Sequence, residues 1–306
     1  FILTTDAEEA LRDADYIITT IRGDADEGRV FDERTALSHG VLGQETTGAG
    51  GFAMALRSIP ILTGYCELAR RVAKPNVLIF NFTNPSGLVT QALRTQGYDM
   101  VYGVCDAPSG FHKQLAALLG VERERFTMRC WGLNHLSWFD SFRVDGEDVT
   151  GKILAAPRLY QDTEMKHFDP ELVRLSGNLL PNEYLYFYYY SNRAVQSILS
   201  SSKTRGETIL EINQKMHRAL DEIDIDRDLE AAFHCFMLHY AMRENSYFTI
   251  ETGGAPKNID VPTVEEFIRQ PDGGGYAGVA LDFIKEKRFG FEEVAYLLLS
   301  GKLPDK

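Results

Sequence analysis

Apolar residues along the first 130 positions fall into short continuous runs that alternate with stretches of helical spacing. The runs Ala14–Thr20, Asn76–Asn81 and Met100–Val104 have the length and composition of buried strands. Between them, Pro60–Ala73 and Leu88–Gln96 place apolar residues on one side of a helix. Because strands that alternate with helices through short links pair in parallel, we predict an α/β fold with a Rossmann-like sheet here.

The pattern changes beyond this part of the chain. Trp131–Phe142 and the residues that follow predict antiparallel strands, and Asp145–Gly146 is typical of a hairpin turn. Helical spacing returns in three later segments, which are Thr208–Leu220, Asp228–Asn245 and Gly274–Lys287. We therefore predict a Rossmann-like domain over residues 1–130 and an α+β domain over residues 131–306 that share one core.

Charge and cysteine content exclude several classes of partner. The formal net charge of −12 argues against nucleic acid and against an anionic membrane surface, while a local basic pocket for an anionic substrate stays compatible with it. No apolar run approaches the ~20 residues of a membrane span. The four cysteines are not spaced as CxxC pairs, so we expect reduced thiols and a cytoplasmic protein.

One cysteine and one histidine are candidates for metal binding. Cys105 and His135 each lie among turn-forming residues after an apolar run. Thiolate and imidazole together suit a transition or borderline metal ion, and two ligands are too few for a structural zinc site. An ion held by two side chains keeps positions for substrate oxygens, which favours catalysis. The alternative is that both side chains simply pack.

Polar residues gather at the ends of the predicted strands. Asn81 and Asn84 follow one strand, and Cys105 and Asp106 follow the next. Ligands of doubly wound sheets bind beyond the carboxyl ends of the strands. We therefore predict a binding site at this edge of the sheet.

Several blocks occur in a fixed order along the chain. They are Gly40–Pro60 with Gln44–Phe52 inside it, Asn81–Ser86, Gly103–Pro108, Gly132–His135, Pro181–Tyr190 and Gly275–Ile284. Together, over nearly the whole chain, they resemble the family 4 glycoside hydrolases, a group dependent on NAD and a divalent metal that includes 6-phospho-glucosidases. The resemblance implies a lactate-dehydrogenase-like architecture whose second domain carries substrate and metal contacts and the oligomer interface.

The family stands outside the two-carboxylate scheme of most glycoside hydrolases. The resemblance implies that NAD takes a hydride from the sugar C3, which acidifies the proton on C2. A base then removes that proton, the aglycone leaves from C1, water adds and the hydride returns. Cys105 and His135 would hold Mn²⁺ or another divalent metal against the sugar O2 and O3. The expected substrate is a phosphorylated disaccharide or glucoside.

The resemblance also assigns the acid and the base. The catalytic tyrosine falls within the Tyr184–Tyr190 cluster, where we assign it to Tyr184, with Tyr188 as the less favoured choice. A neighbouring cation would lower the phenol pKa from its usual ~10. Asp106 would assist departure of the aglycone, which tilts towards α-linkages, although Ala107 departs from the α-type pattern. The alternative is that Asp106 only caps the following helix.

Recognition of the phosphate and the cofactor involves five further residues. Arg29 and Arg205 are placed where phospho-sugar members bind the anion, and a guanidinium fork suits phosphate. Each is equally compatible with a surface charge or an ion pair. Asn84 would hydrogen-bond the substrate, while Arg22 and Asn81 are assigned to NAD. Asn81 is also a typical residue of a turn at a strand end.

Members of the family begin with a strand and a glycine-rich turn that hold the NAD pyrophosphate. Phe1 matches a point beyond them, so we expect this strand and turn to be absent from the chain. We expect a homodimer or homotetramer. The competing hypotheses are a family member acting on unphosphorylated glycosides or uronides, and a truncated inactive paralogue that binds sugar phosphate. A 2-hydroxy-acid dehydrogenase shares the fold but does not predict the Cys105 and His135 pair.

Overall fold

The structure is a computed structural model that describes residues 4–254. The described chain divides into two compact units, one built from residues 4–104 together with 195–254, and the other from residues 105–194. The predicted domain boundary at residue 130 differs from both limits and falls inside strand β4 (Phe126–Leu133). Among residues 4–254, no helix has the length and apolar character needed to cross a membrane.

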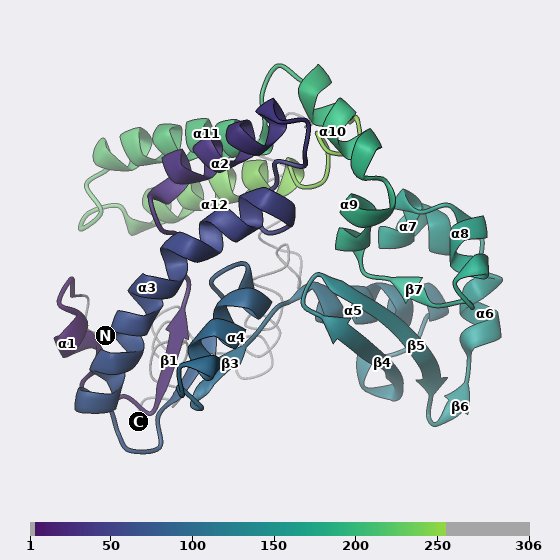
Figure 1. Ribbon diagram of the computed structural model, residues 1–306, viewed down its shortest axis with the longest axis horizontal. Helices are drawn as coiled ribbons and strands as arrows, with labels where there is room; N and C mark the ends of the chain where they lie inside the picture. Colours follow the sequence, from purple (N-terminus) through teal and green to yellow (C-terminus); the bar gives the residue numbers. More distant parts are fainter. Residues whose placement is uncertain (1–3, 255–306) are drawn as a thin grey trace. The chain divides into compact units, whose positions relative to one another are not determined.

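The first unit contains a parallel sheet of strand order β1-β2-β3 (Figure 1). Its strands are β1 (Tyr16–Thr19), β2 (Leu78–Asn81) and β3 (Val101–Gly103). The buried side chains Ile79 and Val101 are opposite one another in the register of β2 and β3. The predicted parallel Rossmann-like sheet is therefore confirmed.

Helices α3 (Gly48–Val72) and α4 (Ser86–Thr95) pack against each other beside this sheet. Their apolar faces form one core with the strands, because Leu62, Cys66, Val89 and Leu93 are all buried there. Helix α3 begins twelve positions before the expected start at Pro60, and this proline lies inside the helix. A proline is favoured in the first turn of a helix, which is why the sequence pattern placed the start too late.

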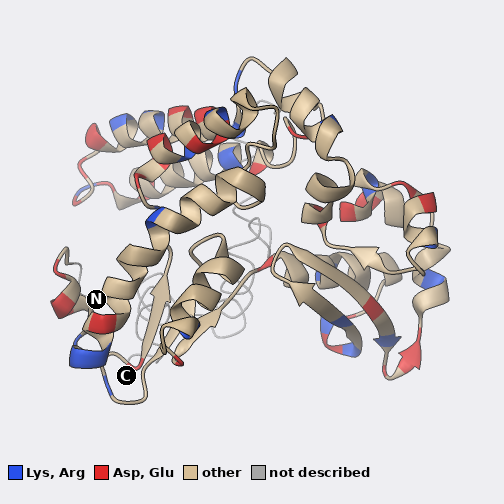
Figure 2. Cartoon of the chain, in the orientation of Figure 1, with Lys and Arg blue, Asp and Glu red and all other residues tan. Residues whose placement is uncertain are grey.

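Three longer helices pack together elsewhere in the first unit. They are α2 (Ala25–Ser38), α11 (Arg205–Asp221) and α12 (Leu229–Asn245), and α11 contacts both others. Blue and red side chains alternate along α2 and α11, whereas the strands of the sheet are tan (Figure 2). The helices predicted in this region are confirmed, while the one expected at Gly274–Lys287 lies outside the described residues.

Helix α11 begins with a complete capping box. Thr204 accepts the backbone N–H of Glu207, and the Glu207 side chain accepts the backbone N–H of Thr204. Two backbone donors of the first turn are satisfied in this way. The cap fixes where α11 starts, and it thereby fixes the position of Arg205 at the first residue of the helix.

The second unit is built on an antiparallel sheet. Strands β4 and β5 (Leu136–Val144) form a hairpin, and β6 (Glu147–Asp148) and β7 (Leu180–Pro181) both pair with β5. The turn expected at Asp145–Gly146 joins β5 to β6, so the predicted antiparallel strands are confirmed. One face of the hairpin packs on α5 (Ala107–Leu119) through buried side chains, which are Phe111, Leu115, Phe126, Phe139 and Phe142.

Short elements complete the described chain. In the first unit α1 (Ala7–Leu11) contacts α3, and α10 (Ser191–Ser200) crosses the limit between the two units. The second unit adds short helical segments, which are η1 (Arg123–Arg125), α6 (Thr150–Leu154), α7 (Leu159–Asp162), η2 (Glu164–His167), α8 (Pro170–Leu175), η3 (Glu183–Leu185) and α9 (Tyr186–Tyr189).

Candidate functional site

The structure brings Cys105 and His135 together within the second unit. Cys105 comes two residues after the end of β3, and His135 occupies the tight turn between β4 and β5. The Cys105 Sγ atom lies 3.5 Å from His135 Nε2, across a sequence separation of 30 residues. His135 has a φ of +60°, a left-handed conformation that is uncommon for a residue other than glycine. Such strain is found preferentially at functional sites.

This separation matches two ligands of one ion. With metal–sulfur and metal–nitrogen bonds of about 2.3 and 2.1 Å at a tetrahedral angle, the two ligand atoms would be about 3.6 Å apart. Among residues 4–254, no group of three or more His, Cys, Asp or Glu side chains is arranged to hold a metal ion. The pair therefore fits an ion whose remaining ligands come from elsewhere, such as substrate oxygens.

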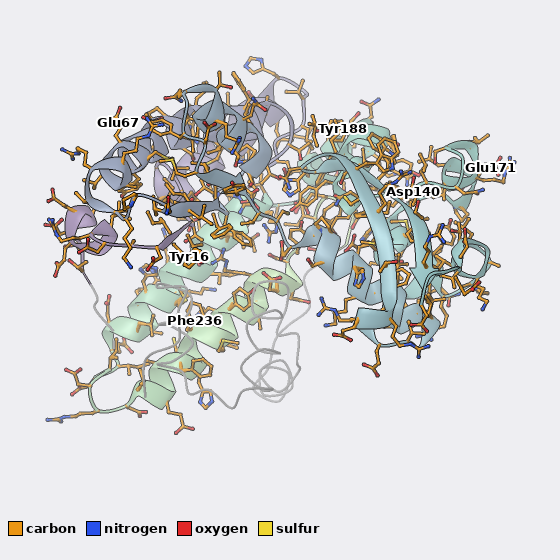
Figure 3. All side chains as sticks on the ribbon, turned by 90° about the horizontal axis from the view of Figure 1, so that it is seen from below. Tyr16, Glu67, Asp140, Glu171, Tyr188 and Phe236 are labelled. Atoms are coloured by element: carbon orange, nitrogen blue, oxygen red, sulfur yellow. The ribbon has the colours of Figure 1, made fainter. Side chains whose placement is uncertain are left out.

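Tyr184 lies directly on the imidazole of His135. The two ring centroids are 3.6 Å apart and their planes differ by 11°. Asn182 fixes the start of this segment, because its side-chain oxygen accepts the backbone N–H of Tyr184 at 3.0 Å. Tyr188, labelled in Figure 3, is 48% exposed, and its partial burial raises the pKa of the phenol. The geometry favours Tyr184 over Tyr188 as the tyrosine of this site.

Asp106 occupies the N-cap position of α5, but its side chain makes no capping hydrogen bond. The interpretation of Asp106 as a helix cap is therefore not supported. The Cys105 Sγ and Asp106 Oδ1 atoms are 4.0 Å apart. Burial raises the pKa of the Asp106 carboxyl, against backbone amides that lower it. A raised pKa favours the protonated carboxyl, which is the form that can act as an acid.

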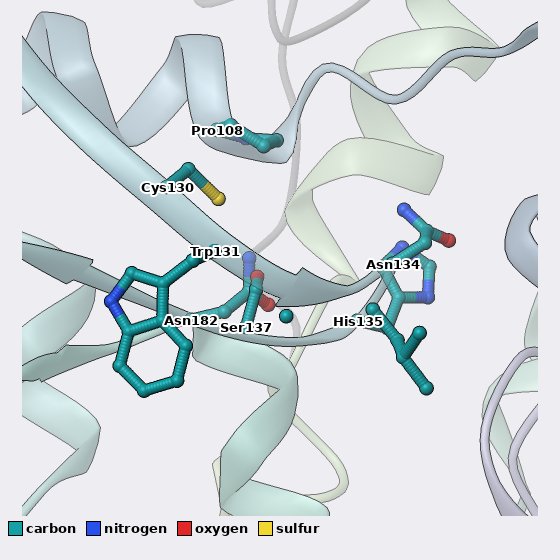
Figure 4. Close-up of a pocket in the computed structure, with 9 residues that line it drawn as sticks. Pro108, Cys130, Trp131, Asn134, His135, Ser137 and Asn182 are labelled. Atoms are coloured by element: carbon teal, nitrogen blue, oxygen red, sulfur yellow. The ribbon is translucent and has the colours of Figure 1, made fainter.

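A shallow pocket of about 120 Å³ extends along the end of the hairpin (Figure 4). Its walls come from Pro108, Cys130, Trp131, Gly132, Leu133, Asn134, His135, Ser137 and Asn182. Gly132 has a φ of +120°, and a Cβ atom there would lie 2.4 Å from the Leu136 carbonyl oxygen. Glycine is thus required where the hairpin closes beside His135.

In the first unit, three arginines converge on one carboxylate. Glu45 accepts ion pairs from Arg29 at 2.7 Å, Arg22 at 2.9 Å and Arg205 at 3.3 Å. Burial would raise the pKa of Glu45, but Arg29, Arg22 and Arg205 together hold it well below its usual range. The expected convergence of Arg29 and Arg205 is present, and their shared partner in this structure is Glu45.

A second carboxylate ties this cluster to helix α11. Glu33 is buried and accepts Arg29 Nε and the backbone N–H of Gly206, both at 2.8 Å. A Cβ atom on Gly206 would lie 2.6 Å from Glu33 Oε2. Arg29 is only 2% exposed and is engaged by both Glu33 and Glu45. Among residues 4–254, Arg205 forms one ion pair, with Glu45, and its charge also lowers the pKa of the buried Glu251 carboxyl. Its guanidinium lies 4.9 Å from the centre of the Tyr247 ring.

The two asparagines differ in their surroundings. Asn81 is fully buried. Its side-chain oxygen accepts hydrogen bonds from the Thr19 hydroxyl and the Thr83 backbone N–H. Its side-chain nitrogen donates to the Thr83 carbonyl oxygen and to the Thr90 hydroxyl. All of its hydrogen-bonding groups are thereby used, so the structure favours the turn-forming role over contact with a cofactor. Asn84 is partly exposed, and its side-chain oxygen accepts the backbone N–H of Ser86 at 3.3 Å.

Models of a single family match nearly all of the chain. The family 4 glycosyl hydrolase model matches residues 1–121, and the model of the family's C-terminal domain matches residues 130–274. The chain belongs to glycosyl hydrolase family 4. The gap between the two matched segments lies near the boundary predicted at residue 130.

Two relatives in family 4 carry related names. The chain is 34% identical over 210 residues to 6-phospho-beta-glucosidase BglT of Thermotoga maritima, covering 68% of this chain and 50% of that protein. It is 30% identical over 301 residues to 6-phospho-alpha-glucosidase 1 of Lacticaseibacillus paracasei, covering 87% and 66% respectively. The chain thus spans between half and about two thirds of the length of these relatives.

A solved structure shares the fold. It is the 6-phospho-beta glucosidase from Thermotoga maritima with manganese, NAD⁺ and glucose-6-phosphate. The TM-score is 0.64 at 29% identity, and the match covers 79% of this chain and 58% of that one.

Within this family 4 chain, two site residues were missed at the level of sequence. Glu45 lies inside the Gln44–Phe52 block, so that block signalled the position but not its role as the partner of three arginines. Glu164 is a carboxyl in η2 whose pKa is raised well above its usual range by burial and by Glu183. No motif pointed to Glu164, because its neighbours come from distant parts of the sequence.

Proposed function

We propose that the protein hydrolyses 6-phospho-glucosides by oxidation at C3, deprotonation at C2 and elimination of the aglycone, with NAD and a divalent metal such as Mn²⁺. The observation that carries this proposal is the 3.5 Å approach of Cys105 Sγ and His135 Nε2. Two relatives are named 6-phospho-glucosidases, and the similar solved structure contains manganese, NAD⁺ and glucose-6-phosphate; both findings support the proposal.

Cys105 and His135 would hold the metal, and their geometry fits this role. When bound, the metal supplies Lewis acidity at the sugar O2 and O3, and NAD supplies a hydride acceptor. Burial raises the pKa of the Cys105 thiol, while hydrogen bonds from the Ala107 backbone and the Asn134 side chain lower it. Cys105 binds the ion as the thiolate, so binding releases a proton there.

Tyr184 and Asp106 each carry out one of the two proton transfers. Tyr184, held against the His135 ring, takes the proton from C2 of the sugar. Asp106, whose carboxyl pKa is raised by burial, gives its proton to the glycosidic oxygen as the aglycone leaves. The charges that develop on the substrate then lie beside groups fixed by the hairpin turn and by the start of α5.

Recognition of the phosphate and the cofactor is assigned to the first unit. Arg205 is the better-placed phosphate ligand, because Arg29 is already engaged by two glutamates. Asn84 follows the carboxyl end of β2 and would hydrogen-bond the sugar. Arg22 follows the end of β1 with its side chain 29% exposed, a position suited to the anionic part of NAD.

The proposal includes the cellular setting and the assembly. All four cysteines are free thiols, as expected in a reducing cytoplasm. A homodimer or homotetramer is the proposed assembly, and light scattering of the purified protein measures it.

Hydrolysis of nitrophenyl α- and β-glucosides, with and without a 6-phosphate, tests the function in the presence of NAD, Mn²⁺ and a reductant. We expect turnover of one phosphorylated anomer, together with exchange of the C2 hydrogen in deuterated water. Tyr184→Phe should abolish that exchange, while Tyr188→Phe, the matched control, should retain it. Turnover of plain glucosides alone would contradict phosphate recognition, and exchange in Tyr184→Phe would place the base elsewhere.

A further inference from the structure

Two indole rings form a stacked pair on the hairpin of the second unit. Trp131 of β4 and Trp138 of β5 are opposite one another, with ring centroids 5.2 Å apart and 26° between their planes. The next residues along each strand, such as Phe139, point to the opposite face of the sheet, where α5 packs. The indole pair therefore lies on the face turned away from the core.

Polar neighbours lie at the edges of both indoles. The Trp138 Nε1–H donates to the Tyr189 hydroxyl at 3.1 Å, and the Trp131 side chain helps to lower the pKa of the neighbouring Asp140 carboxyl. Asp140, labelled on β5 in Figure 3, is itself held by Arg129 through two bonds of 2.7 Å. With these neighbours at their edges, the rings present apolar faces.

The pair is open to binding although one face of each ring is used in stacking. Trp131 is 41% exposed, and exposed Leu133 and Tyr189 extend the apolar surface. A contiguous exposed apolar patch with a polar rim is typical of a binding surface. Here the rim is the Arg129 and Asp140 pair.

The position of Trp131 relative to His135 identifies the occupant. Both residues line the same pocket (Figure 4). Trp131 lies two residues before the end of β4 at Leu133, a distance of about 7 Å along a strand. In the proposed reaction the sugar O2 and O3 face the His135 side. The leaving group is attached to C1, the carbon next to C2, so a leaving group that follows the pocket wall from His135 reaches Trp131.

We infer that Trp131, stacked on Trp138, is the platform on which the ring of the leaving group rests, so that this site selects substrates with a ring-bearing aglycone. The inference rests on the proposed function. A pyranose presents C–H groups on its flat faces and an aryl group presents a π face, and both pack well on an indole. An alkyl aglycone such as methyl is too small to cover the ring.

The test compares phenyl and methyl 6-phospho-glucosides of the anomer that the protein cleaves. Trp131→Ala should lower kcat/KM for the phenyl substrate by roughly tenfold, the loss expected for one stacked ring. The methyl substrate should change by less than about twofold, because it makes no contact with the ring. Trp131→Phe should restore most of the difference. The matched control is Leu175→Ala, an exposed apolar residue of α8 that does not line the pocket, and it should leave both substrates unchanged.

Binding measured by calorimetry without added NAD gives a readout that is independent of turnover. Wild type should bind the phenyl compound more tightly than the methyl one, and Trp131→Ala should remove this preference. Equal losses for both compounds, no loss for either, or a changed oligomeric state of Trp131→Ala would overturn the platform; the last result would make the indole pair a subunit interface. Absence of hydrolysis in wild type would reject the proposed function, while calorimetry would still decide the platform.

Discussion

Buried carboxyls at the two candidate sites lie in opposite environments. In the arginine cluster of the first unit, three arginines hold the pKa of Glu45 well below the usual range despite burial. In the second unit, burial raises the pKa of Asp106, and burial together with Glu183 raises that of Glu164. Arginines thus neutralise Glu45 in the first region, although burial raises the pKa of Glu251 in the same unit, whereas the second region gathers acids beside a thiol and an imidazole.

This difference indicates different roles for the two regions. Buried charges that neutralise one another fix the geometry of α2 and α11, because removing either sign leaves the other without compensation. Acids beside Cys105 and His135 would be stabilised as anions by a cation, so the second region suits a metal ion. The first region is expected to respond to substitution through stability, and the second through activity.

The largest effect is expected at the metal pair. Cys105→Ala should lower kcat/KM by more than about a thousandfold, because a Lewis acid contributes several kcal/mol to the transition state. Stability of the metal-free protein should change little. The matched control is Cys130→Ala, an exposed cysteine on β4 of the same unit, which should retain activity. Comparable activity of Cys105→Ala and wild type would break the comparison.

Glu45→Gln should cost about 3–5 kcal/mol of unfolding free energy, since it leaves buried arginines without their shared partner. Denaturant unfolding measures this loss. Arg34→Gln is the control on the same helix as Arg29. Its pair with Glu207 is largely exposed, so at most about 1 kcal/mol should be lost. If both variants lost the same amount, the arginine cluster would not be a distinct stabilising feature.

Gly206→Ala should destabilise the protein by about 1–3 kcal/mol, because its Cβ would push against the Glu33 carboxylate. The control is Gly64→Ala within α3, where a Cβ meets no atom within 4 Å. That variant should gain up to about 1 kcal/mol from the better helix propensity of alanine. Thermal unfolding of both variants measures the contrast. A gain in Gly206→Ala would show that Glu33 is not held against α11.

The smallest effect concerns pH. The folded-state pKa of Glu164 is raised, so the folded protein keeps this proton longer than the unfolded chain does. Its contribution to stability is therefore present below the unfolded pKa and is lost as pH rises through the folded pKa. Glu164→Gln should stabilise the protein at about pH 8 and leave it nearly unchanged at about pH 4. Denaturant unfolding at both pH values measures the difference.

Glu171 provides the control of opposite sign. Its pKa is lowered by the hydrogen bond from Arg174, so its contribution is present above the unfolded pKa and is lost as pH falls through the folded pKa. Glu171→Gln should therefore lower the free energy of unfolding above the unfolded pKa and leave it nearly unchanged below the folded pKa. The same pH response in both variants would contradict the opposed environments.

The elements of the sheet were predictable because their signals are local. The apolar runs that contain β1, β2 and β3 are bounded by turn residues, and each strand was found within two positions of its ends. The start of α3 was missed because Pro60 resembles a first-turn residue, although the helix continues through it. The domain boundary predicted at residue 130 falls inside β4, and residues of β4 before and after position 130 both pair with β5.

The site was predictable only where a motif brought residues together. Cys105 and His135 belong to recognisable blocks, and the structure places them in contact. The Arg29–Glu33 pair is an i,i+4 pair within α2 and could be expected from the sequence, whereas the approach of Glu45 to Arg205 joins positions 160 residues apart and was not predictable. Asp106 was ambiguous in the sequence because cap residues and catalytic acids share one residue type.

Titration of the purified protein with Mn²⁺, followed by the electron paramagnetic resonance of the free ion, tests the shared metal site most directly. The account predicts one bound ion per chain in wild type, with binding lost in both Cys105→Ala and His135→Ala and retained in Cys130→Ala. Unchanged Mn²⁺ affinity in either of the first two variants would contradict it.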